Sequence, residues 1–323
     1  MSRECSEPSG AGQPGVEFDI RATLGTPGET FGKYQLHRKL GQGGMAEVWL
    51  ASLHGAAGFE KPVVLKRVLP ELAERPKVVE MLIREAKISS GLQHANIVQI
   101  FDLGEVDRRH YITMEYVHGL DLYRLLHRAA ALGVPTPLGL ALHVTAEVLR
   151  GLDYAHRAVS GDGQPLGLVH HDVSPSNILV GLHGVVKIAD FGVARARLHP
   201  DFGGGSFGAR RGKLGYLSPE QVEGRPVDHR SDIFSAAICL YELITRKRLF
   251  RGRTPVETLA NVRAADIDSR LERHPEIPAP VQELLRKALA RVRDRRFQTA
   301  RQFVEAIESL QFDLGLRVSA RDI

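Results

Sequence analysis

The spacing of apolar residues changes once along this chain, close to Gly119. From Tyr34 up to that point, apolar residues come in short runs bounded by Gly, His or Asp, a pattern typical of strands with one buried face. We therefore expect a small, mostly antiparallel sheet in this front region. Its predicted strands are Tyr34–Leu40, Ala46–Leu53, Pro62–Val68, Ile97–Leu103 and Tyr111–Val117.

One segment of the front region, Pro76–Leu92, has a different period. Its apolar residues recur three or four positions apart, which predicts a helix with one buried face. The residues of that face are Val79, Leu82, Ile83 and Ala86. The sheet should therefore be accompanied by a single helix.

Behind Gly119 the apolar spacing becomes helical, as in the series Leu138, Leu142, Leu149 and Leu152. Ile233–Ile244 is apolar nearly all round, which predicts a buried central helix, and Ala300–Leu310 has the pattern of an amphipathic one. A strand-rich front and a helix-rich rear predict an α+β fold with two lobes and a cleft between them. We expect a small front lobe over 34–117, a larger rear lobe over 118–311 and a short tail over 312–323.

Composition limits the class of protein further. Residues 1–30 are rich in Gly, Pro, Ser and Glu, which predicts a flexible leader. Cys5 and Cys239 lie far apart and have neither disulfide-framework nor zinc-site spacing, which favours a reducing cytoplasm. The longest apolar stretch, around Ile233–Ile244, is too short to span a bilayer, so we expect no membrane partner.

The chain has a formal net charge of +5, which raises the question of a nucleic-acid partner. Its arginines are scattered through predicted helices and form no single patch interleaved with aromatic residues. Solvated helix faces explain the charge more simply, and we expect no nucleic-acid partner.

A glycine cluster, Gly41–Val48 (GQGGMAEV), lies between the first two predicted strands. Glycines allow a backbone to approach phosphates closely, although a cluster between strands is more often an ordinary hairpin turn. Its meaning depends on the rest of the chain.

Four further signals follow in a fixed order. Lys66 ends an apolar strand and Glu85 lies on the front helix. The run His170–Asn177 (HHDVSPSN) precedes a short strand, and a second strand runs into Asp190-Phe191-Gly192. Singly, such residues are usually solvated charges or turn formers. Their order is the one that a single phosphoryl-transfer site requires.

With these motifs, the chain from about Tyr34 to Leu310 resembles the bacterial eukaryotic-like (Hanks-type) serine/threonine protein kinases. The resemblance implies a protein-kinase-like fold with ATP in the cleft, where Lys66 holds the α and β phosphates and pairs with Glu85. The nucleotide-binding residues that it implies are Leu40, Gly41, Gln42, Gly43, Gly44, Val48, Lys66, Met114, Glu115, Val117 and Asp121.

The same resemblance assigns the chemistry. Asp172 accepts the proton of the attacking hydroxyl or orients it, while Asn177 and Asp190 supply hard oxygen ligands for Mg²⁺, with Mn²⁺ as a second candidate. Lys66 and Glu85 complete the catalytic set, since phosphoryl transfer depends mostly on positioning and charge neutralisation. The implied acceptors are serine or threonine hydroxyls of proteins, including this chain itself.

Three further residues match structural positions of the family. Glu220, in the run Leu217–Glu220 (LSPE), resembles its buried acid, with Arg296 as the expected ion-pair partner. Asp232, at the start of the buried helix, resembles the aspartate that braces the catalytic loop. We expect these three residues to act on stability.

The sequence also departs from the family pattern. Ala46 and Val64 are mild changes, but His171 stands where most members carry an arginine that clamps a phosphorylated activation segment. Between Asp190 and Glu220 the hydroxyl side chains are Ser206, Tyr216 and Ser218, of which only Ser206 has the character of a free phosphosite. We therefore predict that activity does not require phosphorylation of this segment.

The most informative departure is Ser174, two residues after Asp172, where the family places a lysine that neutralises the moving phosphoryl group. Lys213, in the run Gly212–Tyr216 (GKLGY), occupies the place of a threonine that lies against that lysine. We interpret Lys213 as the relocated cation; the simpler alternative is one more solvated lysine beside Arg210 and Arg211.

Two rival functions stay open. A pseudokinase would bind nucleotide or partners without transfer, and Ser174 and His171 make it worth weighing. Against it, every expected catalytic role is filled, as the set Lys66, Glu85, Asp172, Asn177 and Asp190 shows. A kinase that acts on small molecules fits less well, because the Pro-Glu segment and long helical rear favour protein substrates by analogy.

Overall fold

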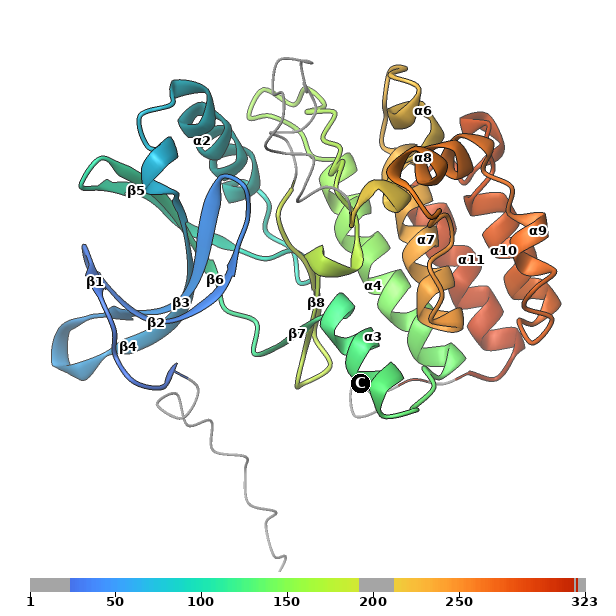
Figure 1. The fold of residues 1–323 in the computed structure, drawn as a ribbon, viewed down its shortest axis with the longest axis horizontal. Coiled ribbons are helices and arrows are strands. Elements are labelled where there is room, and N and C mark those ends of the chain that lie inside the picture. The colour runs from blue at the N-terminus through green and yellow to red at the C-terminus, as the bar shows by residue number, and fades with distance from the viewer. Residues whose placement is uncertain (1–23, 192–211, 317, 319–323) are drawn as a thin grey trace, which may run out of the picture.

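The computed structural model describes residues 24–191, 212–316 and 318. The predicted two-lobed α+β arrangement is confirmed, with the strands gathered in the front lobe and helices filling the rear (Figure 1). The front lobe holds a six-stranded antiparallel sheet in the order β1-β2-β3-β4-β6-β5. Its strands are β1 (Thr30–Phe31), β2 (Tyr34–Gln42), β3 (Ala46–His54), β4 (Glu60–Val68), β5 (Ile100–Val106) and β6 (Arg109–Glu115).

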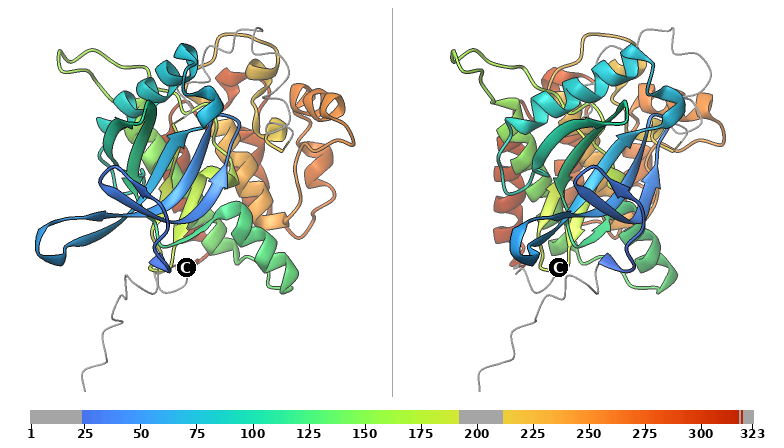
Figure 2. Two further views of the ribbon diagram at one scale, coloured as in Figure 1. Left: turned by 60° about the vertical axis from the view of Figure 1, so that its left-hand side comes forward. Right: turned by 90° about the vertical axis from the view of Figure 1, so that its left-hand side faces the viewer.

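Helix α2 (Pro76–Ser90) packs on β5 and β6, and Figure 2 shows it beside the sheet from two further sides. Leu82 and Ala86 are buried as predicted. The first buried position is Val78, however, while Val79 and Ile83 are only half-buried. The helix is thus rotated relative to the predicted face, because Val78 rather than Val79 falls one turn before Leu82 on the side facing the sheet.

The strand predicted at Ile97–Leu103 begins three residues later, at Ile100. The preceding residues pair instead with β9 (Val186–Ile188) of the rear lobe. Val98 N donates to the Ile188 carbonyl at 3.0 Å, and Ile188 N donates to the Asn96 carbonyl at 2.8 Å. The apolar run therefore serves two sheets, and it fastens the lobes together. Strand β9 belongs to a small sheet with β7 (Gly119–Asp121) and β8 (Ile178–Gly181).

The described part of the predicted leader is folded. Leu24 is only 3% exposed, and Gly28 N donates to the Leu36 carbonyl at 2.8 Å. Glu29 forms a two-pronged ion pair with Arg67 of β4, at 2.9 and 3.1 Å. Composition alone missed this segment because its few anchoring residues are spread among glycines and prolines. Residues 1–23, and with them Cys5, lie outside the described residues.

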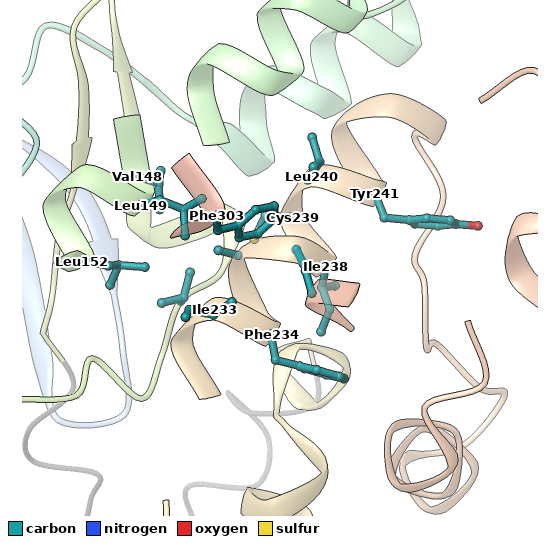
Figure 3. Close-up of a cluster of buried hydrophobic side chains, with 14 of the residues drawn as sticks. Val148, Leu149, Leu152, Ile233, Phe234, Ile238, Cys239, Leu240, Tyr241 and Phe303 are labelled. Atoms are coloured by element: carbon teal, nitrogen blue, oxygen red, sulfur yellow. The ribbon is translucent and has the colours of Figure 1, made fainter. Parts of the chain in front are cut away.

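The rear lobe is built around α7 (Arg230–Thr245), which is buried from Ser231 to Leu243; the sequence predicted a buried helix over Ile233–Ile244. It packs against α4, α10 and α11, and Figure 3 shows buried side chains of α4, α7 and α11, among them Leu149, Cys239 and Phe303. The helices are α3 (Leu122–Ala131), α4 (Leu138–His156), α6 (Pro219–Val222), α7 (Arg230–Thr245), α8 (Pro255–Ala264), α9 (Asp268–Leu271), α10 (Ala279–Ala288) and α11 (Ala300–Asp313). The predicted tail thus starts inside α11.

Short 3₁₀ turns join these elements: η1 (Ala56–Gly58), η2 (Pro70–Leu72), η3 (Pro175–Asn177), η5 (Leu214–Tyr216) and η6 (Arg293–Arg295). Within the part of the chain that the structure describes, none of the helices has the length and apolar character needed to cross a membrane.

Glu220 and Arg296 form a fully buried ion pair in the rear lobe. Arg296 Nη1 and Nη2 lie 2.8 and 2.9 Å from the two carboxylate oxygens, and both side chains are 0% exposed. Ser231 Oγ also donates to Glu220, and Arg296 donates to three backbone carbonyls. The pair holds α6 against the start of α7. Buried charges tolerate the loss of one partner poorly, since the other is left uncompensated.

We expect Arg296→Met to lower the free energy of unfolding by about 3–5 kcal/mol, because Glu220 would stay buried without its partner. The matched control is Arg286→Met, which removes the exposed pair with Asp268 and should cost at most about 1 kcal/mol. Adding Glu220→Leu to Arg296→Met should restore part of the loss. Urea unfolding measures all three, and equal costs for the two single variants would contradict the assignment.

Candidate active site

The glycine cluster forms the turn between β2 and β3. Gly41 and Gln42 are paired with Val48 and Glu47, and Gly43 N donates to the Ala46 carbonyl at 2.8 Å. A Cβ added to Gly41 or Gly44 would meet no atom of the described residues within 4 Å. Packing in the described part of the chain therefore gives no reason for glycine at these two positions, whereas the expected approach of a ligand to the backbone would give one.

Lys66, Glu85 and Asp190 meet between β4, α2 and the end of β9. Lys66 Nζ donates to Glu85 Oε1 at 2.7 Å and to Asp190 Oδ1 at 3.0 Å. Burial alone lowers the pKa of Lys66, but the two carboxylates outweigh it and the pKa is raised. The Lys66 ammonium in turn lowers the pKa of Asp190. The Lys66 ammonium thus contacts the carboxyl groups of Glu85 and Asp190 at this point.

The loop that carries Asp172 is fastened to α7 by a single carboxylate. Asp232 Oδ2 accepts from His170 N at 2.8 Å, and Oδ1 accepts from His171 N at 2.9 Å. His171 has a φ of 65°, in the left-handed region that a non-glycine residue occupies at a cost of roughly 1–2 kcal/mol. His156 Nε2 lies 2.8 Å from the same carboxylate. The expected bracing role of Asp232 thus has a geometric basis.

Asp172 and Asn177 lie side by side in this loop. Asn177 Nδ2 donates to the Asp172 carbonyl and to Asp172 Oδ2, both at 2.8 Å. The backbone also ties the loop to β9, since Ala189 N donates to the Asn177 carbonyl at 2.8 Å. This hydrogen bond holds Asn177 next to the residue that precedes Asp190. The side-chain oxygens of Asn177 and Asp190 therefore lie at the same edge of the site.

Lys213 enters this group from a distant part of the sequence. Its Nζ donates to Asp172 Oδ2 at 2.8 Å and to Asn177 Oδ1 at 3.2 Å. Ser174, by contrast, is buried at 1% exposure and its Oγ lies 3.2 Å from Ser176 Oγ. The ammonium beside Asp172 thus comes from the segment that leads into η5.

The residues expected at the adenine and ribose lie at the junction of the lobes. Met114, at the end of β6, is buried opposite Val64, while the Glu115 side chain is paired with Lys187 at 3.0 Å. Val117 is half-buried. Asp121 caps α3 by accepting from Arg124 N at 2.8 Å. Arg124 also donates to the Leu40 carbonyl at 3.2 Å, so α3 is linked to the strand that leads into the glycine turn.

A small pocket opens beneath α2, next to the Lys66 ion pair. Met114 and Asp190 both contribute to its wall. The residues that line it are Glu85, Ser89, Val98, Ile100, Met114, Ile188, Asp190 and Phe191. Phe191 also packs against the His170 ring, with centroids 4.6 Å apart, so the pocket adjoins the loop of Asp172.

The side-chain oxygens available as metal ligands are Asn177 Oδ1 and the Asp190 carboxylate. Among the described residues no group of three or more His, Cys, Asp or Glu is placed to hold a metal. Mg²⁺ commonly takes one or two protein carboxylates and completes its shell with phosphate oxygens and waters. These two side chains therefore fit a magnesium ion that arrives with a nucleotide.

Glu242 and Arg248, to which the sequence analysis assigned no role, lie on the outer side of the site, where both contact Tyr216. Tyr216 OH donates to Glu242 Oε2 at 2.6 Å, and the Arg248 guanidinium contacts the same hydroxyl. Arg248 Nη2 also donates to the Gly212 carbonyl at 3.2 Å. An acid inside an otherwise apolar helix was a signal for Glu242, whereas nothing in the sequence marked Arg248. Ser206, the expected phosphosite, lies outside the described residues.

Glu242 should make stability depend on pH, because burial raises its pKa from 4.5 to about 7. The folded state then binds a proton more readily than the unfolded state between these values, so this contribution to stability falls as pH rises from about 4.5 to about 7. We expect wild type to lose stability relative to Glu242→Gln over this range in urea unfolding.

The control for this measurement is Glu283→Gln, which changes an exposed glutamate on α10. Its difference from wild type should stay constant with pH. A constant difference for Glu242→Gln as well would mean that the Glu242 carboxylate titrates alike in the folded and unfolded chains.

Comparison with known proteins gives one family throughout. The family model described as the protein kinase domain matches residues 34–307. The tyrosine-protein kinase MasK of Myxococcus xanthus is 40% identical over 281 residues, which cover 87% of this chain and 43% of that protein. Serine/threonine-protein kinase PknB of Mycobacterium tuberculosis is 34% identical over 279 residues, or 85% of this chain and 42% of PknB. The chain thus spans less than half the length of these relatives.

A solved structure supports the same assignment. The crystal structure of the Mycobacterium tuberculosis PknI kinase domain superimposes with a TM-score of 0.62 at 27% identity, covering 88% of this chain and 98% of that one. Sequence and fold agree over the region that carries every residue of the site described above. This chain belongs to the protein kinase family.

Proposed function

We propose that this protein transfers the γ-phosphoryl group of ATP to serine or threonine hydroxyls of proteins. The observation that carries the proposal is the contact of Asp172 with both Asn177 and Lys213, next to an intact Lys66–Glu85 pair. A pseudokinase has no need to keep a charged, ordered group of this kind. The cytoplasmic location expected from the sequence fits this activity.

In this proposal the glycine turn covers the phosphates and Lys66, oriented by Glu85, holds the α and β phosphates. Asn177 and Asp190 would hold magnesium, which neutralises phosphate charge when it is bound with the nucleotide. The Lys66–Asp190 contact at 3.0 Å keeps the phosphate-binding ammonium and the magnesium-binding carboxylate in place before the nucleotide arrives. Pre-organised charge of this kind stabilises a transition state without reorganisation during the reaction.

Asp172 is the group that would act on the acceptor. Its carboxylate orients the attacking hydroxyl and takes its proton as the new oxygen–phosphorus bond forms and the bond to the ADP oxygen breaks. The two donors at Asp172 Oδ2, from Asn177 and Lys213, fix the position of the carboxylate. An aspartate in this setting is oriented before the substrate binds.

Lys213 would supply the positive charge that Ser174 lacks. An ammonium 2.8 Å from Asp172 and 3.2 Å from Asn177 lies between the acceptor side and the metal side of the site. A transferring phosphoryl group has to pass between these two sides, so its developing charge would meet Lys213. The cation thus reaches the reaction from the segment before η5 instead of from the catalytic loop.

We expect Lys213→Thr to lower kcat by about 100-fold, the usual effect of losing one preorganised donor. Adding Ser174→Lys should restore most of this loss, because it returns a cation to the same space. Lys77→Thr removes an exposed lysine of α2 that lies outside the site and serves as the control. Initial rates with saturating ATP and a peptide acceptor measure the effect. A kcat of Lys213→Thr equal to that of wild type would show that Lys213 has no catalytic role.

Tyrosine is a second candidate acceptor. It is favoured by the 40% identity to a protein named a tyrosine-protein kinase and by the absence of the catalytic-loop lysine at Ser174. Serine and threonine are favoured by the names of the other relatives, PknB among them. The question is decided by which residues of a labelled protein carry phosphate.

The test of the function is transfer of labelled γ-phosphate to the protein itself and to a generic basic protein, with ATP and magnesium. We expect transfer by wild type and none by Asp172→Asn, whose amide cannot accept the proton. Acid hydrolysis of the product then identifies phosphoserine, phosphothreonine or phosphotyrosine. ATP binding without any transfer would support the pseudokinase instead.

A further inference from the structure

We propose that the loop between α7 and α8 binds acidic side chains of the protein substrate, close to the acceptor hydroxyl. This inference rests on the proposed kinase function and names its substrate class. The loop covers residues 246–253, and we refer to it as the basic loop. Five of its eight residues are basic: Arg246, Lys247, Arg248, Arg251 and Arg253.

The basic loop is anchored to the segment that completes the active site. Arg248 contacts the Tyr216 hydroxyl, and its guanidinium lies over the Tyr216 ring at 4.9 Å. Tyr216 N in turn donates to the Lys213 carbonyl at 3.1 Å, and Lys213 Nζ lies 2.8 Å from Asp172. Two contacts, Arg248 with Tyr216 and Tyr216 with Lys213, thus link the basic loop to the lysine that binds the Asp172 carboxylate.

The backbone of the basic loop is held in one conformation. Leu249 and Phe250 are each 1% exposed, so the middle of the loop is anchored in the core. Gly252 N donates to Thr258 Oγ1 at 2.9 Å, and a Cβ at Gly252 would lie only 2.6 Å from a side-chain atom of Glu257. Because Gly252 packs closely against α8, the backbone on either side of it, which carries Arg251 and Arg253, is held in place.

Most charges of the basic loop have no opposite charge beside them among the described residues. Among the residues that the structure describes, no ion pair involves the side chains of four exposed members of the loop. These are Arg246, Lys247, Arg251 and Arg253. Other exposed arginines of the rear lobe are paired, for example Arg286 with Asp268 and Arg225 with Glu223, whereas these four basic residues lie together in one loop. The loop therefore presents net positive charge beside the site, where it lowers the energy of an approaching anion.

The positive surface continues to the turn between α3 and α4. Arg246 Nη1 donates to the Val134 carbonyl at 3.4 Å, which brings the basic loop against that turn. Arg128, in the last turn of α3, is exposed and makes no ion pair with any other described residue. An extended peptide lying across η5 would thus have cations along one side.

Acidic peptide side chains fit this surface better than nucleic acid does. Arginine binds a carboxylate or phosphate through two parallel hydrogen bonds, and three of the exposed members are arginines. Proteins that bind single-stranded nucleic acid also need exposed aromatic rings for stacking, and the only aromatic of the loop, Phe250, is buried. A phosphorylated side chain has the same anionic chemistry as a glutamate, and the experiment separates the two.

The test measures kcat/KM for four series of peptides that share one acceptor residue. The positions on either side of the acceptor carry glutamate, alanine, lysine or phosphoserine. Wild type should prefer glutamate over alanine by about tenfold, the combined effect of two exposed ion pairs. In Arg251→Glu/Arg253→Glu this preference should disappear and lysine peptides should become the better substrates, while the rate on the alanine peptide stays within twofold.

A matched control variant, Arg273→Glu/Arg295→Glu, makes the same change in net charge at exposed positions outside the basic loop. It should keep the wild-type preference. Should the reversed loop variant be unstable in thermal unfolding, Arg251→Gln/Arg253→Gln replaces it, and the glutamate preference should then fall to near one. A larger preference for phosphoserine than for glutamate would support the same surface with phosphorylated substrates.

Three outcomes would overturn the proposal. They are equal use of all peptides by wild type, the same loss of preference in the control variant, and inhibition by single-stranded RNA that the loop variant relieves without any peptide preference. Absence of transfer to every peptide, alanine series included, would instead count against the kinase function itself, so the two failures are distinguishable.

Discussion

The buried carboxylate of Asp232 is the constraint on which the site depends. It lies at the start of α7, the helix at the centre of the rear lobe, and accepts hydrogen bonds from the backbone of His170 and His171. Burial alone raises the pKa of Asp232, but its donors outweigh this effect, with His156 first among them, and the pKa is lowered. A fixed charge thus holds the loop of Asp172 in a strained conformation, and the packing of α7 resists any relaxation.

In the proposed function, the site also needs a cation that this loop lacks. Ser174 is buried and uncharged, so a positive charge would have to come from another element. Lys213 would provide it, and its ammonium is positioned by the segment at η5, which packs against α8. The position of the charge next to Asp172 would therefore depend on the packing of η5 against α8. A lysine within the catalytic loop would not depend on that packing.

How much of this could be predicted from sequence depends on the range of the interactions. Strands, the buried helix α7 and the order of catalytic motifs follow from local period and composition, and the structure has them close to the predicted positions. The pairing of Ile97 with β9 and the folded stretch at Leu24 were missed, since each depends on a partner elsewhere in the chain. Arg248 gave no signal for the same reason: only its contact with Tyr216 gives it a role.

In the two proposals made above, the segment from Gly212 to Tyr216 would link catalysis to substrate binding. At one end the Lys213 ammonium contacts Asp172, and at the other Glu242 and Arg248 both contact the Tyr216 hydroxyl. Only two residues separate Lys213 from Tyr216, so a displacement of Tyr216 would also displace the backbone of Lys213. An anion that binds beside Arg248 would therefore act on the same few residues that place a charge next to Asp172, and substrate binding and catalytic geometry would share one structural element.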